Sequence, residues 1–174
     1  MIGKNDMTLL ERAWKAKDLE KVKFLAERGA ELNKRDKKDK TLLHYTFTEE
    51  DWEEKANFLI EIGADVNSQG ENKRTLIYYI LKRGNLSQLK FLLDKGANPN
   101  IKDDLGQTPL HYAVKKGWIN KVKVLVKNGA DLTIKDNKGR TAVDLTNWTF
   151  MKEYLKNQQL SSCQDVFTKS VDSI

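Results

Sequence analysis

Two histidines, one cysteine and one run of carboxylates are the residues of this 174-residue chain that most directly suggest chemistry. His111 lies in the stretch GQTPLHYAVKKGW, where an imidazole could act as a general base or a metal ligand. His44 lies in a similar stretch, TLLHYT, and Cys163 lies far along the chain from both. A nucleophile–base pair or a metal site needs several such groups at suitable spacing. The small number of these residues favours neither.

The carboxylate run offers a second chemical interpretation, a cation site. Its members are Glu49, Glu50, Asp51, Glu53 and Glu54. Acidic side chains also suit the first turn of a helix, where they interact favourably with the helix dipole, and we expect this structural role instead. The sequence contains neither a phosphate-binding loop nor a Gly-x-Gly-x-x-Gly motif. We therefore expect a protein that is not an enzyme and that binds no cofactor and no metal.

The spacing of small residues reveals an internal repeat, which is the first pattern to seek in such a chain. Gly-Ala pairs recur at steps of 34, 33 and 33 residues, beginning at Gly29, Gly63, Gly96 and Gly129. Threonines recur at nearly the same steps, at Thr8, Thr41, Thr75, Thr108 and Thr141. Each Gly-Ala precedes the next threonine by 12 residues, so one extra residue lies in the second unit. Its turn between helices should differ from the others.

Each unit reads as two short helices. The first apolar segment follows the threonine and ends near Gly84 or Gly117, where glycine would supply a left-handed turn. In the second segment, as in INKVKVLVKNGA, Val122, Leu125 and Val126 fall at helical spacing. Helices this short cannot bury their apolar faces alone, so neighbouring units must stack.

The repeated words resemble those of the ankyrin-repeat family: TPLHYA at 108–113, TLLHYT at 41–46, and GAELN, GADVN and GANPN at the unit ends. The resemblance implies an all-α solenoid of stacked helix-turn-helix units joined by finger loops. It assigns five repeats, the first and last of them atypical capping units, at about 1–33, 34–67, 68–100, 101–133 and 134–156. The tail, 157–174, matches no repeat. We expect a turn there, followed by a short amphipathic helix around 165–171 that covers the last repeat.

The repeat also favours a structural role for the two histidines. His44 and His111 occupy the same position of two different units, and the equivalent residues elsewhere are Glu11, Tyr78 and Asp144. A residue that recurs with the unit suggests a helix-start role, with hydrogen bonds to neighbouring backbone. Thr108 and Pro109 fit the cap and the first turn of the same helix.

The resemblance implies a concave binding surface made of finger tips and first helices, with no catalytic role. The finger positions assigned to a partner are Lys37, Lys38, Lys40, Asn72, Arg74, Leu105, Gln107, Lys138 and Arg140. The helix positions are Tyr45, Tyr79, Lys82, Arg83, Tyr112, Lys115 and Lys116. Aromatic residues beside arginines are typical anchors of protein interfaces. In the alternative interpretation, the tyrosines pack between repeats and the lysines form a solvated surface.

Charge favours an acidic or mixed-charge partner. The net charge is +6, and the balance of basic and acidic residues runs from −5 over 41–74 to +6 over 108–140. Such an uneven distribution steers a partner into one orientation. We therefore predict a monomeric protein-binding module that acts as an adaptor or as an inhibitor.

Two alternatives remain open. Basic fingers with interleaved tyrosines could bind single-stranded nucleic acid, although the net charge is modest for that role. A stand-alone ankyrin protein could also be a bacterial effector or a toxin-neutralising protein. A single cysteine, no apolar run long enough to span a membrane and no signal peptide lead us to expect the cytoplasm. Secretion into a host cell would accompany the effector role.

Overall fold

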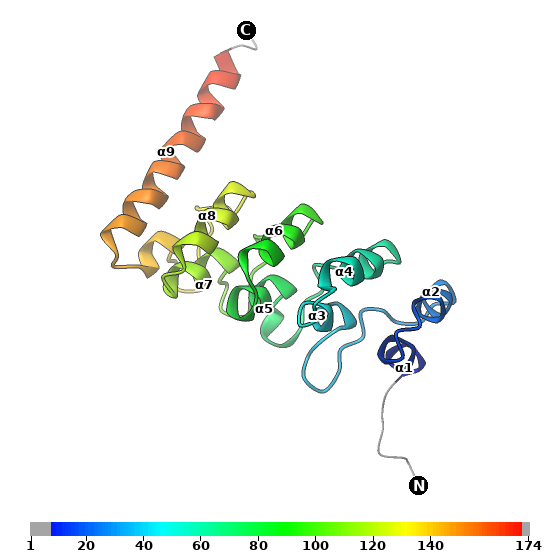
Figure 1. Cartoon of the computed structure of the whole chain (residues 1–174). Helices are drawn as coiled ribbons and strands as arrows, with labels where there is room; N and C mark the ends of the chain where they lie inside the picture. Colours follow the sequence, from blue (N-terminus) through cyan, green and yellow to red (C-terminus); the bar gives the residue numbers. More distant parts are fainter. Residues whose placement is uncertain (1–7, 172–174) are drawn as a thin grey trace. The chain divides into compact units, whose positions relative to one another are not determined.

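The computed structural model describes the backbone of residues 8–171 and the side chains of residues 8–160. Within these residues the regular structure is entirely helical (Figure 1). The chain divides into two compact units, one ending at Glu71 and the other beginning at Asn72. The helices of the first unit are α1 (Leu9–Lys15), α2 (Leu19–Glu27), α3 (Leu42–Thr46) and α4 (Trp52–Glu61). Those of the second are α5 (Leu76–Arg83), α6 (Leu86–Asp94), α7 (Pro109–Lys115), α8 (Ile119–Lys127) and α9 (Thr149–Val171).

Two short 3-10 turns complete the backbone, η1 (Glu71–Lys73) and η2 (Ala142–Leu145). We call α1, α3, α5 and α7 the inner helices, and α2, α4, α6 and α8 the outer helices. The finger loops are residues 34–40, 68–74, 101–107 and 134–140. Each inner helix is followed by its outer helix and then by the next finger loop.

The inner helices begin at the repeated threonines because those side chains cap the exposed N–H groups of the first turn. A reciprocal capping box joins the threonine to the residue three positions later, an arrangement that satisfies two otherwise unpaired donors. It forms in the pairs Thr8–Glu11, Thr41–His44, Thr108–His111 and Thr141–Asp144. Thr75 is the exception, because Tyr78 follows it and the buried Thr75 hydroxyl has no hydrogen-bond partner.

The outer helices end at the Gly-Ala pairs. Gly29, Gly63, Gly96 and Gly129 all have a positive φ, between 85° and 101° for the first three and 83° for the last. The next alanine N–H then reaches back to a carbonyl of the helix, as in Ala130 to Leu125 at 3.0 Å. Glycine tolerates this left-handed conformation without strain, which explains its recurrence.

The turns between inner and outer helices vary more than the repeat predicts. Gly117 is left-handed, with a φ of 71°, as expected. The same expectation for Gly84 is wrong, because its backbone is extended (φ −92°, ψ 175°) and leads directly into Asn85. Asn85 caps α6 in a capping box with Gln88, which sets the chain direction there. The second repeat has a longer turn from Phe47 to Asp51, as its extra residue predicts.

Stacking buries the core of the second unit. Helix α5 packs against α7 and α6 against α8, as Figure 1 shows. Side chains from all four helices are fully excluded from solvent, including Ile77, Leu89, Leu110 and Leu125. Burial of each such side chain stabilises the fold by about 1.5–3 kcal/mol. The stacked arrangement holds the finger loops and the exposed faces of α5 and α7 in fixed positions.

The tail differs from the expected turn and short helix. One uninterrupted helix, α9, runs from Thr149 to Val171 (Figure 1). Its sequence contains no glycine or proline to end it. Met151 and Leu155 are fully buried at its start. The side chains of residues 165–171, assigned to an amphipathic face, lie outside the described residues.

Candidate functional site

Both histidines take part in capping the inner helices that contain them. The Thr108 N–H donates to Nδ1 of His111 at 3.2 Å, and the Thr108 hydroxyl lies 2.9 Å from the same nitrogen. Nε2 of His111 lies 3.1 Å from the Arg140 carbonyl, to which it donates when Nδ1 is the acceptor. The ring is fully buried, and this burial lowers its pKa. His44 makes the same capping contacts with Thr41.

Each finger loop of the second unit turns around a buried aspartate. Oδ1 of Asp136 accepts the N–H groups of Lys138 and Arg140, at 2.9 and 3.0 Å. Oδ1 of Asp103 accepts those of Leu105 and Gln107 in the same way, at 2.9 and 3.0 Å. Both turns therefore present one side chain at the tip. The Leu105 side chain is 57% exposed, and Lys138 is also exposed.

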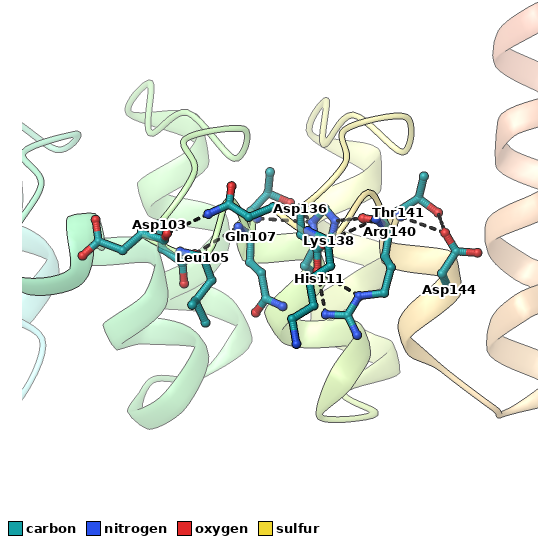
Figure 2. Close-up of polar contacts among 12 residues, drawn as sticks. Asp103, Leu105, Gln107, His111, Asp136, Lys138, Arg140, Thr141 and Asp144 are labelled. Carbon is teal, nitrogen blue, oxygen red and sulfur yellow. Dashed lines mark hydrogen bonds and ion pairs between the residues drawn. The ribbon is translucent and has the colours of Figure 1, made fainter.

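Consecutive finger loops are joined by hydrogen bonds, as Figure 2 shows in part. The Asn137 N–H donates to the Leu105 carbonyl at 3.0 Å, and its side-chain amide donates to the Asp104 carbonyl at 2.9 Å. This close approach requires glycine at Gly106, where the φ is +70° and a Cβ would lie 2.8 Å from the Asn137 backbone nitrogen. The tips are therefore held rigidly before any partner arrives.

Gln107 and Arg140 have roles that the finger assignment did not anticipate. Gln107 was expected to be exposed, but it is only 5% exposed, because its side chain hydrogen-bonds to Asp136 in the next finger. The Arg140 guanidinium binds Oδ2 of Asp136 at 2.8 and 3.1 Å. The Arg140 hydrogen bond is the main cause that lowers the pKa of Asp136. Arg140 is half-buried in this pair, so only part of it faces solvent.

In the third repeat, Tyr78 occupies the position of His111. His111 both caps its own helix and bonds to the next finger loop, whereas Tyr78 makes only the second of these contacts. Its hydroxyl donates to the Gln107 carbonyl at 2.5 Å, just as His111 reaches the carbonyl of Arg140. It lies three residues after Thr75 but leaves that hydroxyl without a partner. Tyr78 therefore keeps the link to the next repeat and loses the cap, while its burial raises the pKa of the phenol.

We expect the Tyr78→Phe variant to be about 1–2 kcal/mol less stable to unfolding than the wild type, because the Gln107 carbonyl loses a donor in a buried position. Urea unfolding followed by circular dichroism measures the change. Tyr112→Phe is the matched control, since it keeps the neighbouring ring in place. An equal loss in both variants would contradict a specific role for the Tyr78 hydroxyl.

Arg74 lies over two tyrosine rings between α5 and α7. Its guanidinium carbon is 5.5 Å from the Tyr78 ring centre and 5.6 Å from that of Tyr112. It also pairs with Asp103 at 3.4 Å. Tyr112 in turn contacts Trp118 edge-on, with ring centres 5.6 Å apart. Tyr112 thus packs between repeats, as the structural alternative proposed, while remaining half-exposed.

The exposed ends of α5 and α7 carry a cluster of positive charge, which we call the basic rim: Lys82, Arg83, Lys115 and Lys116. All four side chains are exposed. They stand at the last turns of their helices, where the helix dipole favours cations. Tyr79 is half-buried on α5, and Asn72 is exposed in η1 with a φ of 57°.

The remaining assigned residues lie in the first unit. Lys37, Lys38, Lys40 and Tyr45 line one open groove of about 920 Å³. Three further lysines also line this groove, although the sequence analysis did not assign them to a binding surface: Lys15, Lys17 and Lys34. Lys17 occupies the repeat position of Gly84 and Gly117. The repeat register therefore predicts that Lys17 lies at the turn between α1 and α2. Its backbone there is left-handed, with a φ of 57°.

The carboxylate run of the second repeat also has a structural explanation. Glu53 and Glu54 lie in the first turn of α4, as expected. Lys55 is 8% exposed and pairs with Glu49 and Asp51. These pairs lower the pKa of Asp51 and raise that of Lys55. Among residues with described side chains, no group of three or more His, Cys, Asp or Glu is placed to hold a metal ion.

Stacked pairs of short helices, capped by threonine and joined by finger loops, define a helical repeat protein. A family model described as ankyrin repeats, in three copies, matches residues 9–103 and 43–136. The chain belongs to the ankyrin-repeat family, whose repeats are generally protein–protein interaction modules and are typically not catalytic. A search of curated proteins gave no significant match. Within the described part of the chain, no helix combines the length and apolar character needed to span a bilayer.

Proposed function

We propose that the second unit binds the acidic surface of a partner protein through its basic rim, the exposed tip residues Leu105 and Lys138, and the half-exposed pair Arg74 and Tyr112. The observation that carries the proposal is the basic rim itself: four exposed cations on two inner helices that pack against each other. Cations on a rigid scaffold attract an acidic partner from a distance and orient it.

The apolar and aromatic residues supply the contacts that charge cannot. The Leu105 N–H is held by Asp103, so the backbone at this tip loses little conformational freedom on binding. The Arg74 guanidinium carbon lies 5.6 Å from the centre of the Tyr112 ring, and arginine and tyrosine are enriched among residues that dominate binding energy. The turns around Asp103 and Asp136 hold the finger tips in place, and Gln107 contributes by its hydrogen bond to Asp136.

The test compares charge reversals on inner and outer helices. The Arg83→Glu and Lys115→Glu double variant changes the rim, and Lys90→Glu with Lys127→Glu makes the same charge change on exposed positions of α6 and α8. Affinity capture from the native lysate identifies a protein that wild type and control retain and the rim variant loses. With that protein purified, we expect the rim variant to lower the association rate constant about tenfold or more.

The same purified pair distinguishes the possible roles. An inhibitor lowers the activity of its partner when it binds, whereas an adaptor leaves the activity intact and brings a third protein into the complex. A partner that is a toxin neutralised by the chain fits the inhibitor role. Loss of nucleic acid rather than protein in the rim variant would replace the proposal with single-strand binding. Equal loss with rim and control variants would contradict a site on the rim.

A further inference from the structure

The first unit contains a groove that the basic rim does not explain. It lies against inner helices α1 and α3 and the finger loop 34–40, and its volume is about 920 Å³. Seven basic residues line it, against three acidic ones, Glu11, Asp36 and Glu49. Five of its lysines are exposed: Lys15, Lys17, Lys34, Lys37 and Lys38. The excess of positive charge favours a ligand of opposite sign.

The groove is held in shape by Asp36 before any ligand enters. Oδ1 of Asp36 accepts the N–H groups of Lys38 and Lys40 at 2.8 and 3.0 Å, and Oδ2 accepts the Tyr45 hydroxyl. The Asp36 N–H closes the turn on the Lys40 carbonyl at 2.9 Å. A preformed turn presents its lysines without a further loss of backbone freedom on binding.

Arg35 lines the groove and supports its wall. Its guanidinium donates to the Asp39 carbonyl at 2.7 Å and to the Ser68 carbonyl at 2.8 Å. These bonds tie one finger loop to the start of the next. Arg35 therefore fixes the loop, while the five exposed lysines are accessible to solvent.

The lining distinguishes among anionic ligands. Small-molecule sites are lined mainly by apolar side chains, whereas ten of the thirteen residues that line this groove are charged. Single-stranded nucleic acid needs exposed aromatic faces for stacking. Trp14 is only 8% exposed, and the Tyr45 ring lies beneath the Lys40 ammonium, 5.0 Å from its centre. Glu11 and Glu49 would also repel a continuous run of phosphates. A peptide can place its own carboxylates away from these two residues.

We propose that this groove binds an acidic, extended segment of a partner protein. The segment's carboxylates would lie on Lys15 at the end of α1, on Lys17 just after it, and on the exposed lysines of the 34–40 finger loop. This site is separate from the basic rim and does not depend on the rim being a binding surface. The partner's acidic segment and the surface bound by the rim belong either to one protein or to two.

Fluorescence anisotropy tests the proposal with the full chain. The probe is a short fluorescein-labelled peptide in which Asp and Glu alternate with Ser and Leu, and its neutral analogue carries Asn and Gln instead. We expect salt-sensitive binding of the acidic peptide and about tenfold or greater weakening in the Lys15→Glu and Lys38→Glu double variant. The matched control is Lys21→Glu with Lys23→Glu, which makes the same charge change on the exposed face of α2. It should alter affinity less than about twofold.

Other results would overturn the proposal. These are no binding of the acidic peptide at low salt, equal binding of the neutral analogue, or equal weakening in the control variant. Tighter binding of a single-stranded oligonucleotide of the same charge would assign the groove to nucleic acid. The Arg83→Glu and Lys115→Glu variant changes only the basic rim, so it should bind the acidic peptide with unchanged affinity. The groove proposal and the rim proposal can therefore fail independently of each other. Circular dichroism confirms that each variant is folded.

Discussion

We expect the His111→Ala variant to be about 4 kcal/mol less stable to unfolding than the wild-type chain. The substitution removes a fully buried ring and leaves a cavity. It also removes the acceptor for the Thr108 N–H and the donor for the Arg140 carbonyl, which are 3.2 and 3.1 Å from the ring nitrogens. Urea unfolding followed by tryptophan fluorescence measures the loss, because Trp118 and Trp148 lie in the same unit.

Asp144→Ala is the matched control for this loss. Asp144 occupies the same repeat position and accepts the Thr141 N–H at 2.8 Å, but its side chain is exposed. Loss of an exposed cap costs about 1 kcal/mol. If the two variants lose equal stability, His111 contributes only a cap, and the bond to Arg140 has no energetic importance.

We expect the chain to lose about 2 kcal/mol of stability between about pH 7 and pH 5 through His44. Burial, followed by the charge of Arg35, lowers the pKa of His44 from 6.5 to about 4. The neutral ring is required because Nδ1 accepts the Thr41 N–H at 3.2 Å. The unfolded chain therefore takes up a proton first as the pH falls. The stability is complete above about pH 6.5 and is lost as the pH falls to about 4.

Two measurements check this dependence. Unfolding free energies at several pH values give the slope, and NMR titration of labelled histidine gives each pKa directly, since the chain has two histidines. His111 shifts in the same direction and adds to the slope. The His44→Gln variant should be less stable at neutral pH and should show a shallower slope. Titration of both rings near 6.5 would contradict the buried, neutral state.

The sequence predicts the helices well because their signals are local. Threonine three residues before His111 or Glu11 is enough to start a helix, and a glycine at the end of each outer helix is enough to stop it. Gly84 could not be predicted in the same way, because the cap at Asn85 determines its backbone. The single long α9 depends on the absence of any helix-breaking residue over 23 positions.

The candidate site is harder to predict, because it depends on contacts between repeats. Gln107 was assigned to the surface by its position in the finger, but its side chain turns towards Asp136, which lies 29 residues later. The groove of the first unit needs α1 and the 34–40 finger loop together, so Lys15 and Lys34 were not recognised. The partner-binding roles of the assigned residues stay predictions.

The bonds from Tyr78 and His111 both run from an inner helix to the following finger loop. In both links the donor precedes its acceptor by 29 residues. The acceptor carbonyls of Gln107 and Arg140 keep a second bond, from the N–H groups of Asp103 and Asp136, both at 2.8 Å. At these two links, shortening the chain from its C-terminal end removes the acceptor of a buried ring, while shortening it from its N-terminal end leaves the acceptor carbonyl paired. The bonds from Asn137 to the preceding finger loop run in the opposite direction. During synthesis, likewise, Tyr78 and His111 gain these bonds only when the next finger loop has left the ribosome.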